Sequence, residues 1–148
     1  MLSRRDFLRH MEALSAGALC GGLVPAMAGC ARFQFVNSGL AGGRLVVSRA
    51  ELGESRFALL EAPNLAMPIY LYRHDDGEFT AVLTRCMHRG CQVEPADGHL
   101  ICPCHGSEYD NAGRILKGPT QLPLIRFPVQ VDGENIYVGL QGVEDGSV

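Results

Sequence analysis

The sequence lacks an excess of positive charge. It has 13 lysine and arginine residues against 16 aspartate and glutamate residues, which gives a formal net charge of −3. The first 29 residues hold three basic and two acidic side chains, so the remainder has 10 basic and 14 acidic residues, a net charge of −4. Nucleic-acid-binding domains carry clustered basic residues. Nucleic acid is therefore not an expected partner.

The sequence also lacks the patterns of several enzyme classes. We find no Ser-His-Asp arrangement, no phosphate-binding glycine loop and no pair of carboxylates suited to acid–base catalysis. No stretch after the first 31 residues shows a convincing helical period of apolar residues. A helical protein and a stand-alone enzyme are therefore not expected.

Short apolar segments rich in Val, Ile, Phe and Tyr predict β-strands at 44–48, 57–60, 69–73, 79–83, 99–102, 126–131 and 136–140. Turn sequences separate them, with hairpin signatures at 75–77, 96–98 and 132–133. The length of 148 residues suits one domain. We therefore predict an all-β fold, a small antiparallel sandwich or barrel over residues 44–142, preceded by a linker at 31–43.

The segment 86–109 contains four of the six cysteines and three of the five histidines. Cys86 and His88 form one closely spaced pair, and Cys102 and His105 form another, so two loops can offer one sulfur and one nitrogen each. This is a four-ligand metal site, and by ligand count alone it also fits Cys2His2 zinc in a binding module without redox activity. Two further cysteines, Cys91 and Cys104, lie beside these pairs. If the loops converge on one metal centre, their sulfurs come close enough to form a disulfide.

The sequences C-M-H-R-G-C and C-P-C-H-G-S resemble the two boxes of the Rieske iron–sulfur family. The resemblance implies a [2Fe-2S] cluster, with Cys86 and Cys102 on one iron and His88 and His105 on the other. It also implies a disulfide between Cys91 and Cys104. Because two neutral imidazoles replace two thiolates, such clusters have raised potentials, roughly −150 to +300 mV. The short connection between the boxes suggests a minimal cluster-binding subdomain.

Four further residues take roles from the same resemblance. Ser107 and Tyr109 match the residues whose hydroxyl groups donate to cluster sulfurs in high-potential members. Gly118 and Pro119 lie in the segment 117–124, which looks like the proline-rich loop covering the cluster. Arg89 departs from the leucine that quinol-oxidising members commonly carry, which weakens a quinol assignment.

The N-terminus resembles a twin-arginine export signal, S-R-R-D-F-L-R, followed by an uncharged stretch at 13–31. Three outcomes fit residues 1–30. Cys30 can be the lipidated cysteine of a lipoprotein, cleavage can follow Ala28, or the segment can remain as an uncut membrane anchor. Two of the three place the protein on the outer face of the bacterial cytoplasmic membrane.

Together these features predict an exported, membrane-tethered Rieske electron-transfer protein. The leading hypothesis is a subunit of a quinol to cytochrome c chain, with a quinol-oxidising membrane subunit and a c-type cytochrome as partners. The alternative is the small Rieske subunit of a molybdenum oxidoreductase such as arsenite oxidase.

Overall fold

A computed structural model describes residues 35, 36 and 38–141 of the chain. All of them belong to one compact unit. The twin-arginine motif, the uncharged stretch and Cys30 lie outside the described residues. Within the described part, none of the helices has the length and apolar character needed to cross a bilayer.

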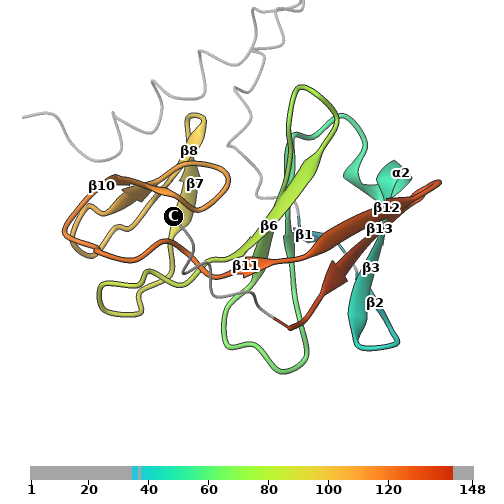
Figure 1. Ribbon diagram of the computed structural model, residues 1–148, viewed down its shortest axis with the longest axis horizontal. Coiled ribbons are helices and arrows are strands. Elements are labelled where there is room, and N and C mark those ends of the chain that lie inside the picture. The colour runs from blue at the N-terminus through green and yellow to red at the C-terminus, as the bar shows by residue number, and fades with distance from the viewer. Residues whose placement is uncertain (1–34, 37, 142–148) are drawn as a thin grey trace, which may run out of the picture. The chain divides into compact units, whose positions relative to one another are not determined.

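Three β-sheets make up the described fold (Figure 1). The central sheet has the order β1 (Phe35–Val36), β4 (Phe57–Leu60), β5 (Ile69–Arg73), β6 (Phe79–Leu83), β11 (Arg126–Phe127). The outer sheet has the order β12 (Val129–Asp132), β13 (Asn135–Gly139), β3 (Arg44–Ser48), β2 (Gly39–Ala41). The small sheet has the order β10 (Ile115–Lys117), β9 (Glu108–Tyr109), β8 (His99–Ile101), β7 (Glu94–Ala96). All named pairings are antiparallel except that of β1 with β4. The predicted all-β class is confirmed.

The central sheet is buried on both faces, and this explains why β5 reads as a continuous apolar run. Successive side chains of a strand point to opposite faces. Ile69 and Leu71 therefore join one apolar cluster with residues of the outer sheet. Tyr70 joins a second cluster, which contains Leu100 and Tyr109 of the small sheet. The central sheet is thus the layer that supports the other two.

Most of the predicted strands are confirmed, four of them with the same ends: β3, β4, β5 and β6. The predicted strand at 126–131 is interrupted at Pro128, where the chain passes from the central sheet to the outer sheet. Proline has no N–H to donate to a ladder, so the strand divides there into β11 and β12. The three predicted hairpin turns are confirmed between β5 and β6, β7 and β8, and β12 and β13.

The range 31–43, predicted as a linker, contains the two short strands β1 and β2. The two strands pair with β4 and β3, although their two or three residues are too few to show an alternating pattern. A short helix, α2 (Arg49–Leu52), was also missed. It begins with a capping box, in which the side chains of Ser48 and Glu51 bond to each other's backbone amides.

Candidate metal centre

Two loops of similar construction carry the predicted metal ligands. The first follows β6, and the second joins β8 to β9. The amide of Gly90 donates to the carbonyl of Cys86 at 2.8 Å, and that of Gly106 donates to Cys102 at 2.9 Å. Both glycines have positive φ, 76° and 71°, which glycine adopts without the steric cost of a side chain. The glycine of each box therefore folds its loop back on itself.

The side chains of the two loops converge. The rings of His88 and His105 lie 4.9 Å apart, nearly perpendicular at 84°. Cys86 and Cys102 are free thiols, each only 1% exposed. The Nδ1 atom of His88 is buried without a hydrogen-bond partner. A buried polar atom without a partner is costly, and coordination of a metal would satisfy it.

A disulfide between Cys91 and Cys104 joins the two loops, with an S–S distance of 2.07 Å. The sulfur of Cys102 lies within 4.8 Å of both. A metal binds cysteine as thiolate, so the disulfide sulfurs are not available as ligands. The free donors at this end of the described fold are two thiols and two imidazoles, a set that suits a [2Fe-2S] cluster or zinc.

The two thiols have different environments. Burial raises the pKa of Cys86, but hydrogen bonds outweigh that effect, chiefly those from the Tyr109 hydroxyl and the His88 amide, and they bring the pKa below its ordinary value. Burial raises the pKa of Cys102 above its ordinary value. Cys86 is therefore the more easily ionised of the two thiols, and the thiolate is the form that binds a metal.

Tyr109 on β9 reaches across to the first loop. Its hydroxyl lies 3.3 Å from the sulfur of Cys86 and accepts the amide of Met87 at 3.3 Å. Burial raises the pKa of Tyr109 to about 12, so the hydroxyl keeps its proton at neutral pH. Because Met87 donates to the oxygen, the proton is free to point towards the sulfur.

Ser107 has a similar arrangement in the second loop. It is completely buried, and its oxygen accepts the amide of Thr120 at 3.2 Å. Thr120 follows Gly118 and Pro119, so this contact fixes the proposed cover segment to the second loop. The serine proton is left for another acceptor. Neither Thr120 nor Met87 was singled out in the sequence, because their contribution is a backbone amide that any residue supplies.

The other two histidines in the described part of the chain have partners away from the two loops. The Nε2 atom of His74 lies 3.1 Å from the hydroxyl of Thr80, and Nδ1 of His99 lies 3.3 Å from the carbonyl of Asp97. Both are satisfied structural histidines. Arg89, between His88 and Gly90 in the first loop, is exposed.

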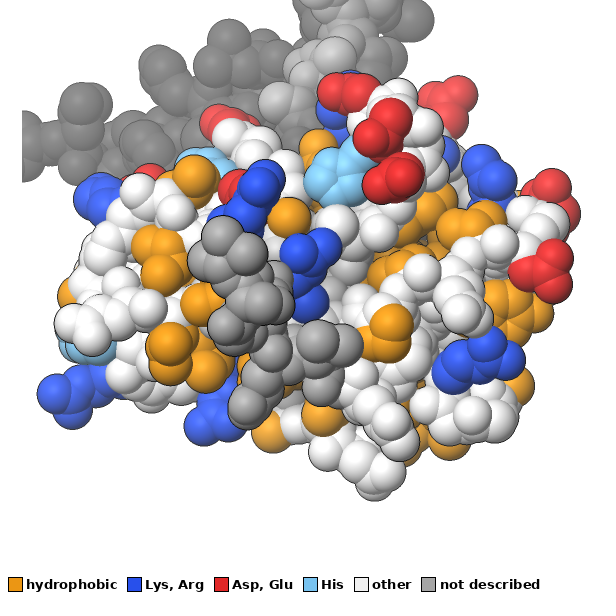
Figure 2. All heavy atoms as spheres, viewed as in Figure 1, with side chains coloured by type: hydrophobic (Ala, Val, Ile, Leu, Met, Phe, Trp, Pro, Cys, Tyr) orange, Lys and Arg blue, Asp and Glu red, His pale blue; other side chains and the backbone are white. Residues whose placement is uncertain are grey.

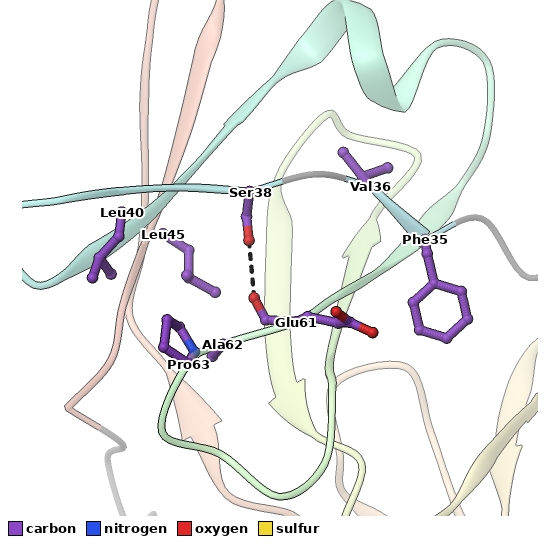
Figure 3. Close-up of a pocket in the computed structure, with 8 residues that line it drawn as sticks. All are labelled: Phe35, Val36, Ser38, Leu40, Leu45, Glu61, Ala62 and Pro63. Carbon is purple, nitrogen blue, oxygen red and sulfur yellow. Dashed lines mark hydrogen bonds between the residues drawn. The ribbon is translucent and has the colours of Figure 1, made fainter.

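A pocket of about 400 Å³ lies elsewhere, along β1, β2 and the chain after β4 (Figure 3). Phe35, Leu40 and Glu61 are among the residues that line it, and Ser38 donates to the carbonyl of Glu61 at 3.0 Å. None of the cysteines or histidines of the two loops lines this pocket. On the part of the surface that Figure 2 leaves uncovered, basic side chains are scattered without a continuous basic area, and acidic side chains gather towards the top and right of the view.

A family model, the Rieske [2Fe-2S] domain, matches residues 43–128, which include both loops and the cover segment. The chain belongs to the Rieske family. Its cofactor is therefore a [2Fe-2S] cluster, and the zinc alternative is set aside. The donor set, the unpartnered nitrogen of His88 and the neighbouring hydroxyl groups all fit this cofactor.

Curated relatives of this Rieske chain include iron–sulfur subunits of cytochrome b6-f complexes. The subunit of Chlorobaculum thiosulfatiphilum is 34% identical over 87 residues, covering 53% of this chain and 48% of the relative. A chloroplastic subunit of Nicotiana tabacum is 38% identical over 76 residues, 48% of this chain and 33% of the relative. The chain thus spans at most about half the length of these relatives. It is a Rieske iron–sulfur protein homologous to them.

Among solved structures, the plasma membrane Rieske protein PetC3 of Synechocystis PCC 6803 is 34% identical, with a TM-score of 0.54. The match covers 62% of this chain and 93% of that protein. A complex of oxygenase and ferredoxin in carbazole 1,9a-dioxygenase gives a TM-score of 0.56 at 22% identity, which shows a common fold only.

Proposed function

We propose that this Rieske protein is an exported, membrane-tethered subunit of a quinol to cytochrome c electron-transfer chain. The contact between the Tyr109 hydroxyl and the Cys86 sulfur carries the proposal, because a donor at a cluster sulfur favours the reduced state and raises the potential. The subunits of cytochrome b6-f complexes among its relatives support a quinol-oxidising membrane partner.

Each ligand has a distinct part in this proposal. Cys86 and Cys102 would hold one iron as thiolates, and His88 and His105 would hold the other as neutral imidazoles. The bound cluster supplies reversible uptake of one electron. His105 is exposed, so its ring would meet the quinol and accept a hydrogen bond from it. Ser107 and Tyr109 would set the potential, and the segment that begins at Gly118 and Pro119 would limit water at the site.

Residues 1–30 would carry the chain to the outer face of the cytoplasmic membrane and keep it there. The twin-arginine motif supports export of a protein that already contains its cofactor. Lipidation of Cys30 or retention of the segment as an anchor would each give a tethered domain. The domain itself would extend to about residue 142.

Arg89 supports the second candidate, the small subunit of a molybdenum oxidoreductase. Arg89 is exposed and follows His88 in the first loop, where an apolar residue would suit contact with a quinol better. Purification of the full-length protein from its native membrane separates the two candidates. A co-purifying cytochrome b supports the first, whereas a molybdopterin-containing subunit supports the second and contradicts the first.

Metal analysis of the same preparation tests the site. We expect two irons and two acid-labile sulfides per chain. His88→Ala or His105→Ala should abolish the cluster, whereas the matched control His99→Ala should retain it. A cluster that survives in both loop variants would show that the ligands are other residues.

A further inference from the structure

The two ligand loops are attached differently to the sheets. The first loop leads from β6 of the central sheet to β7 of the small sheet, with Cys86 near its β6 end, whereas the second lies wholly within the small sheet, between β8 and β9. The hydroxyl of Tyr109 crosses this boundary, because it is on β9 and contacts Cys86 and Met87 of the first loop. The geometry of that contact therefore depends on how the small sheet is seated on the central sheet.

An apolar cluster and a disulfide help to hold the small sheet against the central sheet. The apolar cluster packs Tyr70 and Val82 of the central sheet with Leu100 and Tyr109 of the small sheet. Such packing favours contact but is not directional. The disulfide connects the two loops at the end where the ligands lie.

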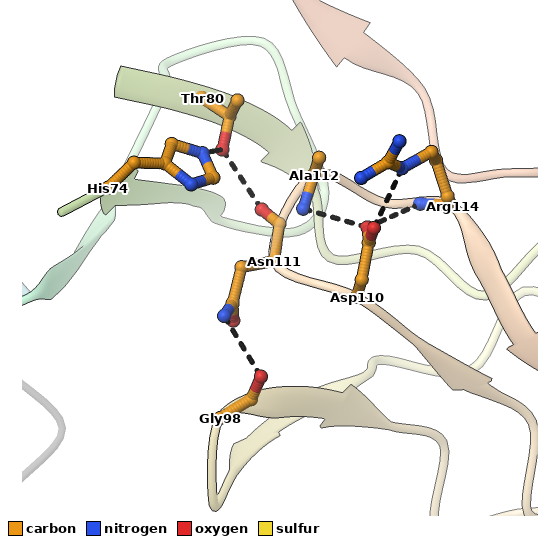
Figure 4. Close-up of polar contacts among 7 residues, drawn as sticks. All are labelled: His74, Thr80, Gly98, Asp110, Asn111, Ala112 and Arg114. Atoms are coloured by element: carbon orange, nitrogen blue, oxygen red, sulfur yellow. Dashed lines mark hydrogen bonds and ion pairs between the residues drawn. The ribbon is translucent and has the colours of Figure 1, made fainter. Parts of the chain in front are cut away.

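Asn111, in the turn after β9, makes a third and directional connection (Figure 4). Its Oδ1 accepts from the Tyr70 hydroxyl of β5 at 2.9 Å, and its Nδ2 donates to the carbonyl of Gly98 at 2.9 Å. Its backbone carbonyl accepts from the Thr80 hydroxyl of β6 at 3.0 Å. One residue thus connects two strands of the central sheet with both turns of the small sheet.

The groups around Asn111 are themselves fixed. The carboxylate of Asp110 accepts the amides of Ala112 and Arg114 at 2.9 and 2.8 Å, and the Arg114 side chain at 2.8 Å. The single proton of the Thr80 hydroxyl goes to Asn111, so the ring nitrogen Nε2 of His74 must be the donor in its contact with Thr80. The turn therefore has one defined hydrogen-bond arrangement.

We propose that Asn111 is a positioning residue for electron transfer, which seats the small sheet so that the Tyr109 hydroxyl stays in reach of the Cys86 sulfur. Two residues of strand span only about 7 Å, so a shift of the turn at Asn111 is transmitted to Tyr109. This inference rests on the proposed tuning role of Tyr109.

The test is a double-mutant cycle read by the reduction potential of the purified holoprotein. Asn111→Ala should lower the potential by less than Tyr109→Phe does. Tyr70→Phe removes the same hydrogen bond from the other side and should have a similar effect, while its ring stays in the core. In a Tyr109→Phe background neither change should lower the potential further, because the contact that they position is gone.

Ser48→Ala serves as the matched control, because it removes a helix cap in the outer sheet region at a comparable cost in stability. It should leave the potential unchanged. Amide hydrogen exchange gives a second readout: Asn111→Ala should speed exchange in the small sheet at 94–101 and 108–117, and Ser48→Ala should not.

Three results would overturn the proposal. The first is a potential that neither Asn111→Ala nor Tyr70→Phe changes, and the second is a fall in potential on either change that is as large in the Tyr109→Phe background as in the wild type. The third is unchanged amide exchange in the small sheet of Asn111→Ala. If Asn111→Ala does not accumulate as folded protein, the reduction potential of Tyr70→Phe alone tests the proposal. A wild-type protein without a [2Fe-2S] spectrum would instead contradict the proposed site itself.

Discussion

The hydroxyl of Tyr109 lies 3.3 Å from the Cys86 sulfur and at the same distance from the Met87 amide. When Cys86 is a thiolate, as in a metal site, the hydroxyl holds the only proton in this contact and is the donor to sulfur. A hydrogen bond to sulfur becomes stronger as the sulfur becomes more negative. The contact therefore favours the reduced state of a metal site that contains Cys86.

Loss of either hydroxyl near the site should lower the reduction potential without loss of the cluster. For Tyr109→Phe and for Ser107→Ala, a hydrogen bond to a charged acceptor worth about 1.5–3 kcal/mol corresponds to roughly 65–130 mV for a one-electron couple. The double variant should fall further. Voltammetry on the purified protein measures these shifts.

Tyr137→Phe is the control for this series, because Tyr137 is on β13 of the outer sheet and faces Arg44 instead of the ligand loops. Its potential should equal that of the wild type. Unchanged potentials in the Ser107 and Tyr109 variants would mean that the two hydroxyls have only a structural role.

Removal of the disulfide should make the position of the two ligand loops relative to each other less fixed. The bond between Cys91 and Cys104 closes a segment with a sequence separation of 13, for which a crosslink contributes about 3 kcal/mol. The variant with both cysteines changed to alanine should unfold at lower urea concentration and lose iron faster. Equal iron retention in the variant and the wild type would show that the apolar packing alone is sufficient.

The ligand loops could be located from the sequence because the spacing of cysteine, histidine and glycine is local. Gly90 and Gly106 each close a turn with a residue four positions earlier, so a short motif carries the whole geometry. Asn111 could not be identified in this way. Its partners Tyr70, Thr80 and Gly98 are 41, 31 and 13 residues away, and only the packing of the sheets brings them together.

The strands also divide into those that could be predicted from the sequence and those that could not. The strands β4, β5 and β6 of the central sheet were predictable because their residues are mostly apolar on both faces. The small sheet was predicted only in part, because β7, β9 and β10 have two or three residues and include Glu, Pro and Lys. β10 is exposed along its length, so no alternation of apolar residues marks it.

Replacement of Arg89 should slow electron transfer to an anionic oxidant. Arg89 is exposed beside His88, and one charge at about 10 Å from a trivalent anion in water is worth about 1 kcal/mol. Arg89→Leu should therefore reduce the rate of oxidation by ferricyanide roughly 3- to 10-fold at low ionic strength, with a smaller effect at high salt.

Arg49→Leu, which removes an exposed charge on α2, should leave this rate nearly unchanged. Equal effects of the two substitutions would mean that the anion responds to the net charge of the protein and not to the charge near His88.

Gly113 should tolerate a side chain less well than Gly98, although both have positive φ, 82° and 79°. A Cβ at Gly113 would lie 3.0 Å from Cγ1 of Val82 and 3.1 Å from Cβ of Leu124, whereas a Cβ at Gly98 would meet nothing within 4 Å. Gly98→Ala therefore adds only backbone strain, about 1 kcal/mol. Gly113→Ala adds overpacking of a further 1–3 kcal/mol or so.

The urea midpoint of unfolding should therefore fall more for Gly113→Ala than for Gly98→Ala. Leu124 ends the proposed cover segment, and its amide donates to the carbonyl of Gly113 at 2.9 Å. Displacement of Leu124 should thus loosen the cover as well, and iron should be lost faster from Gly113→Ala. Equal midpoints for the two variants would show that Val82 and Leu124 move aside without cost.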